Sequence, residues 1–383
     1  MNAKSGEIGV CLEHRFYEYS GHTYTKLAFS YEYWRDYLSH FDGVAVIARV
    51  QQIPSVEPGM VRVDGPGVTV EPIPYYVGPR EFVSTIPALM SRMVMLAKKY
   101  DRFLLRTGNV ANLLWLLLII KRKPYLREYP GNVWEGVVGF AGENLAIKSL
   151  AWFLHYFARI QGRFSVANSF VSRYCEGLYG SKRPGYVFSS FALDEVSTLK
   201  ESFDIAEVGV RIISVGRLEG EKGHASLIDA VGKLQSRCRV VLEFVGDGSK
   251  LNQLRERAKM AGVEAVFLGA ITDRGRLFEA LSQADIFVIP SLTEGMPRAL
   301  LEAMAVGLPC VGSRVGGIPE VLDEKFLYSP GDSFELACLI ERLVADPDLR
   351  RQQGHRNRSL VRHRYSRQEM RAQKSAFWSC INE

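Results

Sequence analysis

The chain has 383 residues, of which 47% are hydrophobic and 23% charged, and its formal net charge is +6. This length and composition exclude a disordered or fibrous chain and leave room for two globular domains. The longest apolar run, 113–120, falls far short of the roughly 20 residues that span a bilayer, and residues 1–7 lack the apolar core of a signal peptide. The six scattered cysteines form no C-x-x-C pair, which argues against a zinc site or disulfide framework and favours a reducing cytoplasm.

The first half of the chain, residues 1–193, predicts one α/β domain, because short apolar runs alternate with helical patterns. The expected strands are 8–12, 44–48, 68–72, 103–105, 125–128 and 164–167. The expected helices are 31–39, 81–100, 109–121, 143–160 and 169–178. The polar stretch that follows, within 194–207, predicts an interdomain linker.

The second domain, residues 208–365, alternates more regularly. Its expected strands are 211–215, 239–245, 265–268, 285–289, 310–313 and 326–328, and its expected helices are 224–235, 249–260, 273–283, 297–306 and 332–345. This alternation predicts a parallel, doubly wound sheet that binds its ligand at the carboxyl ends of the strands. Residues 366–382 predict a final helix.

Two carboxylates, Glu294 and Glu302, stand eight residues apart around an expected helix start. Pro297 suits the first helical turn, and Gly307 suits the position after the last turn. The free N–H groups of such a helix start can face an anion, and residues 297–302 rise roughly 7–8 Å along the axis. The segment therefore suits a molecule with a hydroxyl-rich group at each end and phosphate between, which is the layout of a nucleotide sugar.

Four further motifs follow strands of the same half. They are Gly216-Arg217-Leu218 with Lys222-Gly223, the sequence VGDG at 245–248, LG at 268–269 and VGGIPE at 315–320. Each is an expected strand-to-helix turn, so all would line one rim of the sheet. Glycines in such turns let the backbone approach a phosphate.

In this order, over residues 211–320, the motifs resemble the retaining GT-B glycosyltransferases of family 4, which are marked by E-x7-E. The resemblance covers about a third of the chain. It implies two Rossmann-like domains facing across a cleft, with a final segment, 366–383, packing back on the first domain. It also implies transfer of a sugar from a nucleoside-diphosphate sugar to a hydroxyl, without a catalytic metal or other cofactor.

The resemblance also implies residue roles. Arg217 and Lys222 would hold the diphosphate and neutralise the charge that develops as the sugar departs. Glu294 would accept hydrogen bonds from the sugar hydroxyls, and these three residues form the expected catalytic set. Glu302 would take both ribose hydroxyls, because one carboxylate offers two acceptors to a cis-diol. The other residues expected to line the site of the sugar donor are Gly216, Gly246, Gly269, Ile271, Gly295, Met296, Pro297 and Arg298.

The first domain departs from the family pattern, so the acceptor side rests on weaker signals. Gly21, after the first strand, would let the backbone approach the phosphate of the sugar donor, or it is an ordinary loop glycine. The usual His-Gly pair is missing from 127–134, where Gly131 and Asn132 are the best substitutes. His22 would replace the histidine, unless it is a solvent-exposed loop residue. Arg106 would point into the cleft, unless it pairs with an acid, either Asp101 or Glu128.

Several alternatives stay open. The helical patterns at 109–121 and 143–159 are apolar, aromatic and basic, so they predict either core helices or contact with a membrane surface, where a polyprenyl-linked acceptor would be reached. The basic stretch 350–374 predicts solvated helix faces or attraction to anionic lipid. The pair Asp346 and Asp348 lies in an expected late turn, so we assign it no metal. A nucleotide-sugar 2-epimerase and a non-catalytic nucleotide-sugar-binding protein are the alternative functions. No recognition motif supports nucleic-acid binding.

Overall fold

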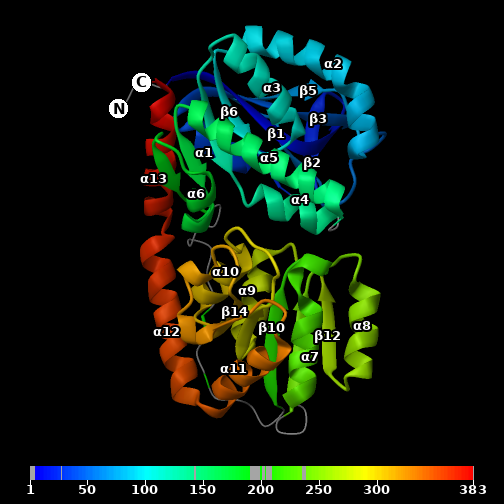
Figure 1. Cartoon of the computed structure of the whole chain (residues 1–383), viewed down its shortest axis with the longest axis vertical. Coiled ribbons are helices and arrows are strands. Elements are labelled where there is room, and N and C mark those ends of the chain that lie inside the picture. The colour runs from blue at the N-terminus through cyan, green and yellow to red at the C-terminus, as the bar shows by residue number, and fades with distance from the viewer. Residues whose placement is uncertain are drawn as a thin grey trace.

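The computed structural model describes residues 5–26, 28–141, 144–189, 199–200, 203, 209–234 and 239–382. It contains two separate α/β units, each built on its own sheet and stacked one above the other in Figure 1. The first sheet has nine described strands and the second has six. The predicted α/β class, with two Rossmann-like sheets, is therefore correct.

The first sheet is organised around the long strand β1 (Ser5–Tyr19), which lies parallel to β3 (Phe41–Gln52) on one side and β6 (Arg102–Arg106) on the other. After Cys11 the register of β1 against β3 shifts, and β1 continues into a hairpin with β2 (His22–Thr25). The remaining strands are β4 (Val61–Arg62), β5 (Val68–Ile73), β7 (Tyr125–Tyr129), β8 (Asn168–Phe170) and β9 (Gly185–Val187).

Six helices cover this sheet: α1 (Tyr31–Leu38), α2 (Gly78–Lys99), α3 (Asn109–Ile120), α4 (Val133–Ala141), α5 (Leu145–Phe164) and α6 (Arg173–Tyr179). The strand predicted at 164–167 is wrong, because α5 runs on to Phe164 and β8 begins only at Asn168. The helix predicted from 169 likewise begins at Arg173. The apolar pattern misplaced this strand because β8 buries two polar residues, Asn168 and Ser169.

The second sheet is parallel throughout, and its strands are β10 (Val210–Val215), β11 (Val240–Val245), β12 (Glu264–Gly269), β13 (Ile286–Ile289), β14 (Cys310–Ser313) and β15 (Leu327–Tyr328). The connecting helices are α7 (His224–Leu234), α8 (Leu251–Met260), α9 (Arg274–Gln283), α10 (Arg298–Val306) and α11 (Ser333–Ala345). Each described element lies within two residues of its predicted ends, because a sheet buried on both faces produces continuous apolar runs.

Two final helices run along one side of both units in Figure 1, namely α12 (Pro347–Arg364) and α13 (Arg367–Ser379). Phe377 and Trp378 of α13 are buried in the core of the first unit, where the Trp378 and Tyr37 rings lie 4.5 Å apart. For α12 the sequence predicted only the basic stretch 350–374 and no helix bounds, because its polar composition carries little apolar periodicity. Asp346 caps its first turn by accepting a hydrogen bond from the N–H of Leu349, at 2.8 Å.

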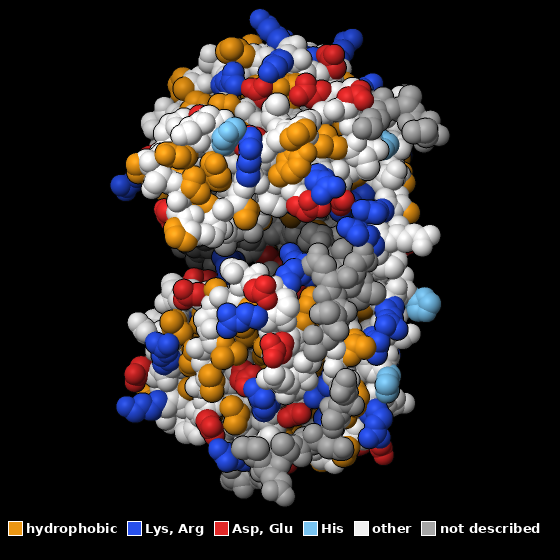
Figure 2. Space-filling view, turned by 180° about the vertical axis from the view of Figure 1, so that it is seen from behind, with side chains coloured by type: hydrophobic (Ala, Val, Ile, Leu, Met, Phe, Trp, Pro, Cys, Tyr) orange, Lys and Arg blue, Asp and Glu red, His pale blue; other side chains and the backbone are white. Residues whose placement is uncertain are grey.

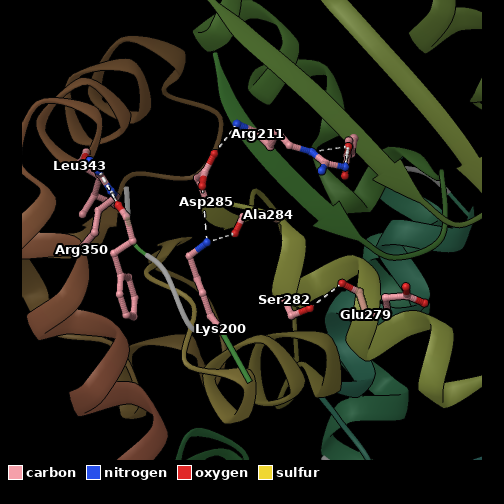
Figure 3. Close-up of polar contacts among 10 residues, drawn as sticks. Lys200, Arg211, Glu279, Ser282, Ala284, Asp285, Leu343 and Arg350 are labelled. Atoms are coloured by element: carbon pink, nitrogen blue, oxygen red, sulfur yellow. Dashed lines mark hydrogen bonds and ion pairs between the residues drawn. The ribbon is translucent and has the colours of Figure 1, made fainter. Parts of the chain in front are cut away.

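The described residues of the predicted linker pack against the second unit, as Figure 3 shows. The ammonium of Lys200 donates to the carbonyl of Ala284 at 2.7 Å and lies 3.4 Å from the carboxylate of Asp285. Arg350 is buried and donates to the carbonyl oxygens of Phe203 and Leu343 at 2.7 and 2.6 Å. Burial lowers the pKa of Lys200 despite the neighbouring carboxylate. Lys200 and Phe203 are therefore fixed to the second sheet and its helices.

Candidate functional site

The surface is hollowed between the two units, as Figure 2 shows from behind. At this cleft the loop after β7 meets the loop after β13. A β-carbon at Gly295 would lie 3.1 Å from the carbonyl oxygen of Pro130 and 3.4 Å from the Cα of Gly131. Each of these loops leaves the carboxyl end of a parallel strand, which is where open α/β sheets bind ligands. The carboxyl edges of both sheets therefore face the same cleft.

A partly buried ion pair lies at the carboxyl edge of the second sheet. The Lys222 ammonium is 2.5 Å from Oε1 of Glu294, and the hydroxyl of Ser291 donates to the same oxygen at 2.7 Å. Only 20% of the Lys222 side chain and 11% of the Glu294 side chain are exposed. The two residues are 72 positions apart, and the fold places a cation and a carboxylate side by side at the rim.

Close packing between loops fixes this pair. Gly223 follows Lys222 with φ +66°, and a β-carbon there would lie 1.9 Å from the carbonyl oxygen of Pro290. A β-carbon at Gly246 would lie 1.9 Å from the carbonyl oxygen of Gly216. The structure thus gives these glycines a role that the sequence did not suggest, since they let neighbouring strand-end loops pack backbone against backbone.

Arg217 lies at the surface of the same rim. Its side chain is 72% exposed, and its guanidinium is 2.8 Å from the carboxylate of Glu221. Behind it, His224 begins α7 and is buried, with Nε2 3.3 Å from the carbonyl oxygen of Arg217. Burial lowers the pKa of His224 to about 4, so this histidine is neutral at neutral pH. It supports the loop from behind, in agreement with the expectation that it starts a helix.

Glu302 lies in the second turn of α10, and only 6% of its side chain is exposed. Arg298, one turn earlier, places Nε 3.0 Å from Oε1 of Glu302, and Arg274 of α9 places a guanidinium nitrogen 3.5 Å from the same oxygen. Pro297 precedes the first helical residue and has extended backbone angles. The predicted carboxylate is therefore at a helix start beside the rim, in contact with two arginines.

The remaining residues predicted to contact the sugar donor surround this helix start and the neighbouring strand ends. The N–H of Gly317 donates to the carbonyl of Gly295 at 2.7 Å, and the hydroxyl of Tyr365 is 3.8 Å from the sulfur of Met296. Gly269 ends β12, and its carbonyl accepts a hydrogen bond from the N–H of Gly246 at 2.8 Å. Ile271 packs against a hydrophobic core of the second unit. These residues thus belong to one continuous rim.

On the first unit, the structure separates the four acceptor-side candidates. Gly131 lies directly across the cleft from Gly295. Asn132 caps α4, because its side-chain oxygen accepts the N–H of Trp134 at 3.0 Å. Arg106 is held by Glu128 at 2.9 Å and by the hydroxyl of Tyr33 at 2.9 Å, which is the ion-pair alternative raised from the sequence.

Gly21 and His22 lie elsewhere, at the tip of the β1–β2 hairpin. Nδ1 of His22 is 3.3 Å from the carboxylate of Asp64 and 2.8 Å from the guanidinium of Arg62. Gly21 lines a surface hollow together with the same two side chains. The contacts of this histidine are therefore with the β4–β5 region of its own unit.

Two glutamates that bridge the units were not identified from the sequence. Glu135 of α4 accepts a hydrogen bond from the hydroxyl of Thr293, in the loop that carries Glu294. Glu320 accepts the N–H groups of Arg173 and Tyr174, at the start of α6, at 3.0 and 2.7 Å. Glu320 does stand in a recognised motif, whereas nothing in the sequence pairs Glu135 with a residue 158 positions away.

Another polar cluster that the sequence did not reveal is centred on Glu13, just after the part of β1 that pairs with β6. The carboxylate of Glu13 accepts the N–H of Val110 at 3.0 Å, lies 3.1 Å from Arg49 and accepts a hydrogen bond from Tyr76. Burial and nearby arginines lower the pKa of His14 to about 4. The run Glu-His-Arg directly after the first predicted strand, 8–12, was the available signal for this group.

Comparison with known proteins agrees with this arrangement. The family model "Glycosyl transferases group 1" matches residues 196–360. Protein CapJ of Staphylococcus aureus is 27% identical over 347 residues, which cover 88% of this chain and 86% of CapJ. The amylovoran biosynthesis glycosyltransferase AmsK of Erwinia amylovora is 38% identical over 146 residues, covering 35% of this chain and 36% of AmsK.

Solved structures show the same fold over the whole length. Sucrose-phosphate synthase from Thermosynechococcus elongatus superposes with a TM-score of 0.76 at 17% identity, covering 99% of both chains. Anabaena HepE in complex with UDP-glucose superposes with a TM-score of 0.69 at 18% identity, covering 97% of this chain and 99% of HepE. The fold is GT-B. Residues 196–360 match the group 1 glycosyltransferases, and the predicted resemblance to the retaining family 4 enzymes is confirmed.

Proposed function

We propose that this enzyme transfers a hexose from a nucleoside-diphosphate sugar to a hydroxyl of a glycan or polyprenyl-linked acceptor, with retention of anomeric configuration. The observation that carries the proposal is the partly buried Lys222–Glu294 pair, 2.5 Å apart at the carboxyl edge of the second sheet. It sets a cation for a diphosphate beside a carboxylate for sugar hydroxyls. The structure of HepE with UDP-glucose supports a nucleotide sugar as the substrate class.

The chemistry follows from charge. As the sugar leaves, negative charge accumulates on the diphosphate, and Lys222 is positioned to stabilise it, with Arg217 reaching in from the exposed rim. Glu294 accepts hydrogen bonds from the sugar hydroxyls and so orients the anomeric carbon. Glu302 binds the ribose at the other end of the molecule. The leaving phosphate takes the proton of the acceptor hydroxyl on the same face of the sugar, which retains the configuration.

We further propose that the product belongs to a cell-surface polysaccharide or glycoconjugate. AmsK and the putative teichuronic acid biosynthesis glycosyltransferase TuaC of Bacillus subtilis carry such names, and TuaC is 33% identical over 132 residues, which cover 34% of this chain and 32% of TuaC. We place the enzyme in the cytoplasm, at the inner face of the membrane. The five cysteines that the structure describes are all unpaired, as a reducing compartment requires.

We also propose domain limits of 1–193 for the acceptor side and 208–365 for the side that binds the sugar donor, with 366–383 returning to the first domain. The packing of Phe377 and Trp378 in the first core supports the last of these. Lys200 and Phe203, within the proposed linker 194–207, pack on the second domain. Expressing residues 1–193 together with 366–383 tests the first and last limits, because the final segment completes the first core, and we expect a cooperative unfolding transition.

Thermal-shift screening with UDP, GDP and ADP, followed by their sugars, tests the proposed function. We expect one diphosphate and its sugar to raise the melting temperature, and Glu302→Ala to abolish most of that rise. Release of the diphosphate should then require an acceptor. Release of an epimerised sugar without any acceptor would favour the 2-epimerase instead, and binding without turnover on any acceptor would favour a non-catalytic partner.

A further inference from the structure

Helix α5 has its large apolar side chains on the outside. The residues that it buries against the first unit are small or polar: Ala151, Ala158, Gln161 and Gly162. The residues that it exposes are large and apolar: Leu145, Leu150, Trp152, Phe153, Tyr156 and Phe164. Leu145 is 82% exposed and Trp152 is 62% exposed. A surface helix normally directs such residues toward the core, so this face is suited to a partner outside the chain.

Helix α3 extends the same surface. The side chain of Gln161 in α5 donates to that of Asn112 in α3 at 2.9 Å, and the rings of Trp115 and Phe157 lie 4.9 Å apart. Figure 1 shows the two helices as neighbours on one side of the first sheet. Along α3, Leu116, Ile119 and Ile120 are exposed, Ile120 by 77%. We call the exposed apolar residues of both helices the α3–α5 face: Leu116, Ile119, Ile120, Leu145, Leu150, Trp152, Phe153, Tyr156 and Phe164.

The charged residues of the two segments that form this face have one sign. Residues 144–164 contain Lys148, Arg159 and Arg163 and no acid, and residues 109–123 end in Lys121, Arg122 and Lys123 and also contain no acid. Arg159, Arg163, Lys121 and Arg122 are exposed, whereas Lys123 pairs with Asp101 at 2.8 Å. The apolar face therefore carries a basic margin, which a negatively charged partner would complement.

We propose that the α3–α5 face docks on the surface of a lipid bilayer that contains anionic lipids. The aromatic and aliphatic side chains enter the boundary between headgroups and acyl chains, and the basic residues contact lipid phosphates. Tryptophan and tyrosine suit this depth, since each combines an apolar ring with a polar group. The contact lies in the membrane plane, and among the described helices none is long and apolar enough to cross a bilayer.

Charge favours lipid over a second copy of the chain. A symmetric pair of α3–α5 faces would bring two basic margins together without acids in these segments to offset them. The position of the α3–α5 face also suits delivery of an acceptor to the cleft. Helix α5 follows α4, and Gly131 in the loop before α4 faces Gly295, so a membrane-borne acceptor would approach the rim from this side. This route for the acceptor rests on the proposed function, whereas the docking itself does not.

Vesicle co-sedimentation without any sugar donor tests the docking. We expect the protein to bind phosphatidylcholine vesicles that contain phosphatidylglycerol, to bind pure phosphatidylcholine weakly, and to lose affinity as salt is raised. The double variant Trp152→Ser/Phe153→Ser should lose at least tenfold in affinity. Arg159→Gln and Arg163→Gln should each lose about fivefold, the effect of one basic side chain near an anionic surface. Phe334→Ser is the matched control, since Phe334 is 69% exposed on α11 of the other unit, and its affinity should not change.

Fluorescence locates the contact. Of the five tryptophans, Trp34, Trp115 and Trp378 are buried and Trp134 is partly buried. The exposed Trp152 should therefore account for most of a blue shift on vesicle addition, and Trp152→Phe should remove that part while Trp134→Phe should leave it. Equal vesicle affinity of the wild type and the double variant would overturn the proposal. So would a dimer that dissociates in the double variant without any vesicle binding, because the face would then join two copies. Nucleotide-induced thermal shifts, measured on the same variants, separate a failure of docking from a failure of the proposed function.

Discussion

Replacing Gly223 by alanine tests whether the packing of loops holds Lys222 against Glu294. A β-carbon at Gly223 would lie 1.9 Å from the carbonyl oxygen of Pro290, whereas real β-carbons essentially never approach closer than 3.0 Å. The loop must therefore retreat by the difference, about 1.1 Å. Transmitted to the neighbouring Lys222, that retreat would lengthen its 2.5 Å ion pair with Glu294 to as much as about 3.6 Å, beyond hydrogen-bond range.

The matched control is Gly262→Ala. Gly262 has φ +65°, against +66° at Gly223, but a β-carbon there would meet no atom within 4 Å. Both variants incur about 1–2 kcal/mol for a left-handed alanine, and Gly223→Ala adds about 1–3 kcal/mol for overpacking. Chemical denaturation gives the two free energies of unfolding, and calorimetry gives affinity for the preferred nucleoside diphosphate. We expect only Gly223→Ala to weaken nucleotide binding. Equal unfolding energies and unchanged affinity would refute the steric argument.

The other predictions concern the carboxylates and the buried histidine. Glu294→Gln keeps the size of the side chain but removes the charge beside Lys222, so turnover should fall at least a hundredfold with little change in melting temperature. Near-normal turnover would contradict its role. Glu302→Ala should weaken nucleoside diphosphate binding about tenfold or more in calorimetry, whereas unchanged affinity would exclude the ribose contact. The pKa of His224 is lowered from 6.5 to about 4, so its stabilising effect is complete above pH 6.5 and is lost as the pH falls toward 4. Between pH 6.5 and 4, the free energy of unfolding of His224→Gln should therefore fall less than that of the wild type, by up to about 3 kcal/mol. An equal fall with pH in the two proteins would contradict this role of His224.

The second half of the molecule was largely predictable because its signals are local. Strands buried on both faces appear as continuous apolar runs. The end of α10 was marked by Gly307, because glycine favours the left-handed conformation, φ +96°, that ends the helix. Where polar residues are buried, the same reasoning failed. Asn168 can lie in β8 because its side chain finds partners inside the fold, for example the carbonyl of Gly162, which accepts from Asn168 at 3.0 Å.

The sequence by itself determined the class of fold. It also predicted a rim of glycine turns and indicated Lys222, Glu294 and Glu302 as candidate site residues, because each of these predictions depends on residue type at a short spacing. Only the tertiary structure decided which of these side chains meet. It paired Lys222 with Glu294 and directed Arg106 to Glu128. It also joined Glu135 to Thr293 across the cleft and turned the aromatic residues of α5 outward. Contacts between residues far apart in the chain depend on how the sheets and helices pack, and no local pattern records that packing.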